Sequence, residues 1–136
     1  MSTKITKDKV FELAKKYNLE YENVSTYAEN PWWEFYLPVG YVDNCEDFRD
    51  NLFAFDEDWM NENGEYTTNI SIYNKFKINS GIDHFNVYYN EDCANVSTME
   101  ELEKIVSAMV KLGSRWNVIR KEMNEMIELF KVQEDF

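Results

Sequence analysis

The negative charge of this chain is confined to one segment, and that confinement limits how the chain can fold. Residues 17–74 contain 13 acidic side chains and a single basic one, Arg49, so the segment carries a net charge of −12. The whole chain of 136 residues also has a net charge of −12, from 14 basic and 26 acidic residues, so the two flanks are balanced. The segment contains Trp32, Trp33 and Trp59 as well. A stable fold must therefore bury aromatic side chains there while keeping many carboxylates in water.

The composition indicates a single folded domain spanning residues 1–136. A hydrophobic content of 44% and an aromatic content of 16% supply the apolar area that disordered acidic chains lack. The length suits one domain with its own core. No apolar run approaches the roughly 18 residues of a membrane span, and the lysine-bearing start lacks the apolar region of a secretory signal. We therefore expect a cytoplasmic protein, acting in the host cytoplasm if a phage encodes it.

The first elements are predicted from apolar spacing. Residues 6–17 should form a helix, because Val10, Leu13, Ala14 and Tyr17 recur on one helical face. Thr6 is the expected N-cap, and Asn18 should end the helix in the left-handed conformation. Strands are expected at residues 20–28 and 32–39, the second with aromatic residues on both faces.

An acidic helix is predicted over residues 43–63. Its apolar positions are three or four residues apart, as on one face of a helix, and they are Cys45, Phe48, Leu52, Phe55 and Trp59. Asp43 and Glu46 have the spacing of a capping box. The opposite face would present carboxylates to solvent, and burial of the aromatic side chains should outweigh their mutual repulsion.

The rest of the sequence, from residue 66 onward, predicts a hairpin followed by a helical region. Residues 66–72 and 82–89 should pair as antiparallel strands, with residues 75–78 as a continuation of the first. Residues 98–132 should be helical, with two alternatives at Gly113: a break that gives two helices, or a kink in one long helix. The predicted fold is α+β, with an N-terminal helix, an antiparallel sheet of three or four strands, the acidic helix and a C-terminal helical pair or kinked long helix.

The chemistry-bearing residues form no catalytic motif. The lone His84 has no histidine partner for a zinc site, and Cys45 and Cys93 are too few for a thiolate cluster. No phosphate-binding glycine loop is present among the four glycines. The sequence therefore predicts a non-enzymatic protein with no catalytic residues, no metal site and no cofactor.

The acidity predicts a basic partner. A strongly negative chain is a poor ligand for nucleic acid or for an anionic membrane, because Lys and Arg lead the binding of such polyanions. It suits a basic protein instead, such as a nucleic-acid-handling enzyme or a toxin. The predicted contacts are the acids Glu46, Asp47, Asp50, Glu57, Asp58 and Glu62, with Trp32, Trp33 and Tyr36 as aromatic anchors.

The predicted function is that of a nucleic-acid mimic, whose carboxylates imitate a phosphate backbone and block a basic groove. In composition the chain is similar to inhibitors of the anti-CRISPR, anti-restriction and toxin-immunity kinds, which share no common motif. One alternative is a small-ligand-binding module or a carboxylate-based enzyme with an aromatic-lined pocket. A further alternative is a homodimer formed through the C-terminal helices.

Overall fold

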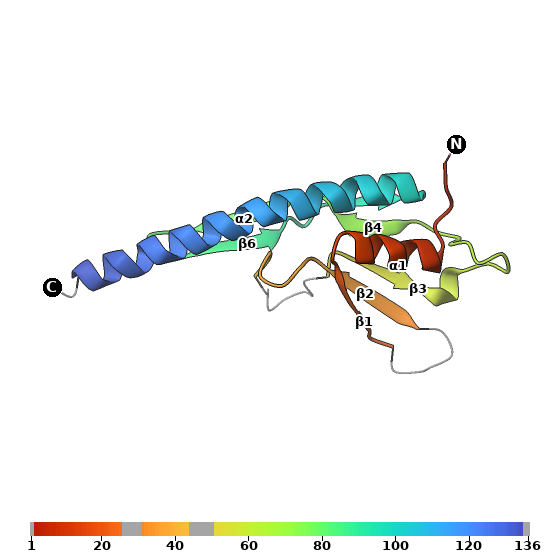
Figure 1. The fold of residues 1–136 in the computed structure, drawn as a ribbon, viewed down its shortest axis with the longest axis horizontal. Coiled ribbons are helices and arrows are strands. Elements are labelled where there is room, and N and C mark those ends of the chain that lie inside the picture. The colour runs from red at the N-terminus through yellow and green to blue at the C-terminus, as the bar shows by residue number, and fades with distance from the viewer. Residues whose placement is uncertain (1, 26–30, 44–50, 135–136) are drawn as a thin grey trace.

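The fold is α+β, as predicted, and its strands form two antiparallel sheets beside two helices (Figure 1). The structure is a computed structural model that describes residues 2–25, 31–43 and 51–134. Five strands form the main sheet, in the order β1-β2-β3-β4-β7, and β5 and β6 form a separate hairpin. The sheet thus has more strands than the three or four expected. The elements are α1 (Lys7–Lys16), β1 (Glu20–Asn23), β2 (Trp32–Tyr36), β3 (Phe53–Asp56), a 3-10 turn η1 (Glu57–Trp59), β4 (Ile70–Tyr73), β5 (Phe76–Ser80), β6 (Phe85–Tyr89), β7 (Cys93–Val96) and α2 (Met99–Glu134).

Helix α1 confirms its sequence prediction. Val10, Leu13 and Ala14 are buried, and the Thr6 side chain accepts a hydrogen bond from the Lys9 N–H at the helix start. Asn18 has a φ of 58°, the left-handed conformation expected after the helix.

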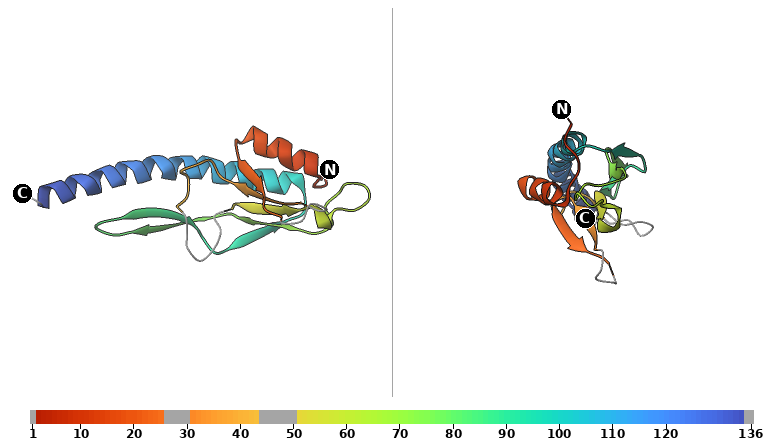
Figure 2. Two further views of the ribbon diagram at one scale, coloured as in Figure 1. Left: turned by 90° about the horizontal axis from the view of Figure 1, so that it is seen from below. Right: turned by 90° about the vertical axis from the view of Figure 1, so that its right-hand side faces the viewer.

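Both helices lie on the same side of the main sheet (Figure 2). The core between the helices and the sheet joins apolar residues of α1 and the first half of α2 to alternate residues of the strands. Phe35 of β2 and Phe53 of β3 stack at its centre, with ring centroids 4.7 Å apart. Among the described elements, no helix lies on the opposite face of the sheet.

The prediction of an acidic helix over residues 43–63 is wrong for the described part of that range. Residues 53–56 are strand β3, and only Glu57–Trp59 make a helical turn. Phe53 and Phe55 are both buried, which is the two-residue period of a strand, whereas the expected helical face would have excluded Phe53. Trp59, which should have been buried, is 54% exposed. Cys45, Glu46 and Phe48 lie outside the described residues.

The predicted hairpin is confirmed for its continuation at residues 76–78, which pair with residues 87–89, but the pairing of residues 66–72 with residues 82–89 is wrong. Strand β4 pairs with β3 and β7, and β6 pairs with β5 through a register that places Phe76 opposite Tyr89. The short turn at Gly81 joins β5 directly to β6. Strand β5 therefore pairs with β6, which had been expected to pair with β4. Strand β7, which the sequence reading assigned to no element, completes the sheet.

Helix α2 runs without interruption for 36 residues, so the expected helical pair does not form. Gly113 is buried inside the helix, and a Cβ atom at this position would lie 2.7 Å from Tyr41 Cδ2 and 3.2 Å from Phe76 Cζ. The glycine therefore allows close packing of α2 against two aromatic rings. Its role is steric, which explains why it does not end the helix.

Candidate functional site

The helix-free face of the sheet carries acids at alternate positions of adjacent strands. The register places Glu20 opposite Tyr36, Glu22 opposite Glu34, and Trp32 opposite Asp56. Directly paired residues share a face of a sheet, so these six side chains lie together. We call this set the acidic sheet face: Glu20, Glu22, Trp32, Glu34, Tyr36 and Asp56.

The intervening residues of the same strands form the covered face. Trp33 and Phe35 of β2 pack edge-on against Phe11 of α1, with ring centroids 5.1 and 5.4 Å from it. The sequence W-W-E-F-Y thus alternates between core and open face. Adjacent tryptophans consequently have different roles, since Trp32 is 46% exposed while Trp33 is half-buried.

A tyrosine links two of the carboxylates on the acidic sheet face. The Tyr36 hydroxyl lies 2.6 Å from Glu34 Oε2 and 2.8 Å from Glu22 Oε1, and its single hydrogen serves both. Glu34 is only 4% exposed. Burial, followed by hydrogen bonds to the two carboxylates, raises the pKa of Tyr36 far above its ordinary value of 10.0. Tyr36 is therefore a neutral donor between two acids that would otherwise repel across the strands.

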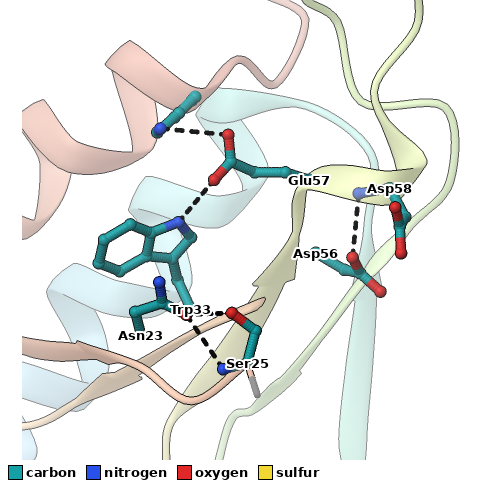
Figure 3. Close-up of polar contacts among 7 residues, drawn as sticks. Asn23, Ser25, Trp33, Asp56, Glu57 and Asp58 are labelled. Atoms are coloured by element: carbon teal, nitrogen blue, oxygen red, sulfur yellow. Dashed lines mark hydrogen bonds and ion pairs between the residues drawn. The ribbon is translucent and has the colours of Figure 1, made fainter. Parts of the chain in front are cut away.

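Glu57 points to the other side of the sheet and is used internally (Figure 3). Its Oε1 lies 3.1 Å from the Lys7 ammonium, and its Oε2 accepts a 2.8 Å hydrogen bond from Trp33 Nε1. The side chains of Asp56 and Asp58 point away from this contact. Asp56 Oδ1 accepts the Asp58 N–H at 3.0 Å and so caps the η1 turn.

Asp43 is a further acid of the segment that is neutralised internally. Its Oδ1 lies 3.0 Å from Arg120 Nη1, and its Oδ2 accepts the Val87 N–H at 2.8 Å. Arg120 also donates to the Gly40 carbonyl. Within the described ranges, the acids of the segment that form no ion pair with a lysine or arginine are Glu20, Glu22, Asp56, Asp58, Glu62 and Glu65. Most of the described negative charge is therefore not neutralised by the basic flanks.

The predicted contact residues are divided by the structure. Trp32 and Tyr36 lie on the acidic sheet face, and Asp58 and Glu62 are exposed nearby in sequence, at and beyond η1. Trp33 and Glu57 instead hold α1 against the sheet. The remaining three, Glu46, Asp47 and Asp50, lie outside the described residues.

Four acids of this surface were not predicted as contacts, namely Glu20, Glu22, Glu34 and Asp56. Their signal is the alternation of acid with aromatic residues in E-Y-E at residues 20–22 and W-E-F at residues 33–35, typical of strands with one apolar and one polar face. Only the register between β1, β2 and β3 shows that these acids share a face.

A cleft of about 350 Å³ lies beside the acidic sheet face. Glu20 and Tyr36 line one part of it, and Asp43, Gly40 and Arg120 line another. Its volume falls in the range of small-molecule sites. The Arg120 guanidinium in the wall of the cleft is already paired with the Asp43 carboxylate.

Three further findings describe the chain as a whole. In the described portion, no three His, Cys, Asp or Glu side chains are grouped as ligands for a metal ion. No described helix combines the length and apolarity needed to cross a bilayer. The chain matches no protein-family model, and neither the curated proteins nor the solved structures include a match to it.

Proposed function

We propose that this protein is a non-enzymatic inhibitor whose acidic sheet face occupies a basic, nucleic-acid-binding surface of a partner protein. The observation that supports this proposal is the gathering of Glu20, Glu22 and Asp56, with Trp32 and Tyr36, on a sheet face that no described helix covers. We place its action in the cytoplasm, where nucleic-acid-handling enzymes and toxins meet such inhibitors, of the anti-CRISPR, anti-restriction or immunity kind.

The spacing of the carboxylates favours a polyanion-binding partner. Side chains two positions apart on a strand are separated by about 6.5–7 Å, and directly opposite side chains by about 4.5–5.5 Å. Two neighbouring strands thus hold charges at intervals of several ångströms, fixed by the backbone. A rigid array of this kind attracts a basic groove over a distance and needs little ordering on binding.

The aromatic side chains supply the complementary apolar contact. Trp32 is directly opposite Asp56 and is 46% exposed, so a partner can cover the indole while its cations meet the acids. Tryptophan and tyrosine are the residues on which binding energy most often concentrates at interfaces.

The test is a pull-down with charge-matched variants. The immobilised protein is incubated with a nuclease-treated lysate of its native cell, and retained proteins are identified at increasing salt and with duplex DNA as competitor. The test variant neutralises Glu20→Gln, Glu22→Gln and Asp56→Asn, of which the last keeps a capping side chain. The control neutralises three exposed acids elsewhere, Glu12→Gln, Glu91→Gln and Asp92→Asn.

We expect the wild type and the control to retain a basic nucleic-acid-binding protein that duplex DNA displaces. Retention should fall steeply between low and physiological salt. The test variant should lose this protein. Equal retention by the test variant, or retention that DNA does not affect, would contradict the proposal.

The cleft beside Glu20 and Tyr36 is the observation that favours the alternative, a small-ligand module or carboxylate-based enzyme. A ligand enclosed there would make mostly short-range contacts, so its binding would change little with salt. Thermal stabilisation by a small molecule, unchanged from low to physiological salt and lost in a cleft variant such as Val39→Trp, would support this alternative over the inhibitor.

A further inference from the structure

Strand β1 forms one edge of the main sheet, and its outer side is open. It stands at the end of the strand order, and all four of its residues are exposed (Figure 1). At the other edge of the sheet, the N-terminal segment lies beside the end of β7, where Lys4 forms an antiparallel bridge with Thr98. No described residue pairs with β1 on its outer side.

The hydrogen bonds between β1 and β2 determine which backbone groups point outward. In an antiparallel pair, residues that exchange two hydrogen bonds with their opposite residue alternate with residues that exchange none. The Val24 N–H donates to the Trp32 carbonyl at 2.8 Å, so the residues of β1 that bond to β2 are the even-numbered ones. The N–H and C=O groups of Tyr21 and Asn23 therefore point away from β2. Among the described residues, none hydrogen-bonds to these four groups.

A strand added at this edge would meet carboxylates on one of its faces. Glu20 and Glu22 belong to the acidic sheet face, and directly opposite residues share a face of a sheet. In an antiparallel sixth strand, the side chains opposite these two glutamates would join that face. Lysine or arginine at those positions would complement the two charges.

On its other face, the added strand would meet a hollow between β1 and α1. The hollow has a volume of about 470 Å³ and is lined by Asp8, Phe11, Glu12, Lys15 and Tyr21. The Tyr21 ring lies edge-on to the Phe11 ring, with centroids 4.9 Å apart, and Tyr21 is 50% exposed. Directly opposite side chains are about 4.5–5.5 Å apart, so an apolar side chain opposite Tyr21 would cover the exposed ring and enter this hollow.

The two glutamates disfavour a second copy of β1 as the added strand. In the antiparallel registers with the greatest overlap, Glu20 would lie opposite Glu22, or Glu22 would lie opposite its own copy. Like charges directly opposite each other destabilise a strand pair. Charged side chains are one means by which edge strands avoid pairing with themselves. The same charges leave the edge open to a basic strand.

We infer that β1 accepts an extended segment of the partner protein as a sixth, antiparallel strand in which basic and apolar residues alternate. The basic side chains lie opposite Glu20 and Glu22, and the apolar ones lie opposite Tyr21 and Asn23. Backbone hydrogen bonds give an added strand its affinity, and alternate side chains give it specificity. The inference rests on the proposed function for the basic character of the partner, and it adds the way in which the partner is held.

Peptides with a methylated backbone test the added strand on the wild-type protein. The probe is a capped peptide of seven residues in which lysine and valine alternate, so that its valines pair with Tyr21 and Asn23. Methylation of the valine nitrogens removes the donors that face β1, whereas methylation of the lysine nitrogens removes donors that face solvent. All three peptides carry the same charges.

We expect the unmodified and lysine-methylated peptides to bind and to slow hydrogen exchange at the Tyr21 and Asn23 amides. The valine-methylated peptide should bind about tenfold more weakly, because two backbone hydrogen bonds are lost. Equal binding by the two methylated peptides would show attraction of charge alone and would overturn the inference, as would no binding at about 1 mM peptide. Tighter binding of the valine-methylated peptide would indicate a parallel strand and reject the proposed arrangement.

The variants Asn23→Pro and Asn23→Ala distinguish this inference from the proposed function. Both remove the side chain that accepts the Ser25 N–H, and both keep every carboxylate of the acidic sheet face. Only proline removes the outward N–H, and it leaves the hydrogen bonds between β1 and β2 in place. Both variants should retain the circular dichroism spectrum of the wild type.

In the pull-down described above, Asn23→Ala should retain the protein that duplex DNA displaces, and Asn23→Pro should lose most of it. Equal retention by the two variants would reject the added strand and leave the proposed function standing. Failure of the wild type to retain such a protein would reject the proposed function. The methylated peptides, which need no variant and no lysate, would then decide whether β1 accepts a strand.

Discussion

The main sheet and the C-terminal half of α2, which extends beyond that sheet beside the β5–β6 hairpin, expose surfaces of different chemistry. On the sheet, Trp33, Phe35 and Phe53 lie on the helix-covered side, and the acids lie on the opposite side together with Trp32 and Tyr36, so the opposite side offers charge. On this half of α2 the charges of both signs nearly balance, and several large apolar side chains are exposed. The comparison shows that one chain can offer two surfaces of different chemistry, one charged and one apolar. Because the two surfaces are built from different elements, substitutions can separate them.

The largest difference between the two regions should appear in stability. Phe53→Ala removes a side chain that is 1% exposed and stacked on Phe35, so we expect a loss of about 3–5 kcal/mol in the free energy of unfolding. Met126→Ala, at an exposed position in the C-terminal half of α2, should cost well under 1 kcal/mol. Urea unfolding of both variants at low protein concentration measures this contrast. Similar losses for the two variants would mean that the Met126 side chain is buried in solution.

Gly113 lies at the boundary of the two regions, and its substitution should have the next largest effect. Gly113→Ala gains roughly 1 kcal/mol of helix propensity, yet its methyl group would meet the Tyr41 and Phe76 rings. We expect overpacking to prevail and to destabilise the protein by about 1–3 kcal/mol. Ser114→Ala, at the exposed neighbouring position, is the matched control and should be neutral or stabilising. A stabilised Gly113→Ala would show that the rings move aside easily.

Tyr36→Phe should weaken the acidic sheet face in a pH-dependent way. At pH 8 the loss of a donor to the buried Glu34 should cost about 1–2 kcal/mol. The raised pKa of Tyr36 means that the unfolded chain loses the phenol proton first, near pH 10.0, so the wild type loses this stabilisation as the pH rises above that value. The difference between wild type and variant in urea unfolding should therefore narrow from pH 8 to pH 11. A difference that stayed constant would contradict this role.

The smallest effect should come from Glu57, which is acidic but not part of the open face. Glu57→Gln weakens its contact with Lys7, and we expect a loss of about 1 kcal/mol in the free energy of unfolding. Asp58→Asn, the adjacent exposed acid, should change stability by less than about 0.5 kcal/mol. In partner binding, Asp58→Asn should have the larger effect and Glu57→Gln the smaller one. Equal stability losses at both positions would remove the distinction between internal and exposed acids.

The fold was predictable where the sequence pattern has one interpretation. The cap, the apolar face and the end of α1 all follow from local rules, and so does the existence of β1 and β2. Residues 52–59 satisfy both a helical and a strand period, and the sheet resolves the ambiguity because Phe53 and Phe55 fill its core. No local pattern indicates that the space at Gly113 is occupied by rings from residues 41 and 76.

The sequence predicted that the candidate surface is acidic, but it predicted only some of the residues that form it. The confinement of charge to residues 17–74 indicated an acidic surface containing Trp32 and Tyr36. Glu57 was misassigned because its contact with Lys7 joins positions 50 residues apart in sequence. Glu20 and Asp56 were missed because only strand register places them on the same face as Trp32.

Because α2 is unbroken, the side of the helix that faces the core also fixes which side faces the β5–β6 hairpin. A single residue inserted after Gly113 would turn everything beyond it by about 100° about the helix axis. Ile127 would then swing away from Phe85 and Val87, although no contact within the main sheet had changed. This part of the chain should thus tolerate exchanges of side chains far better than changes in length.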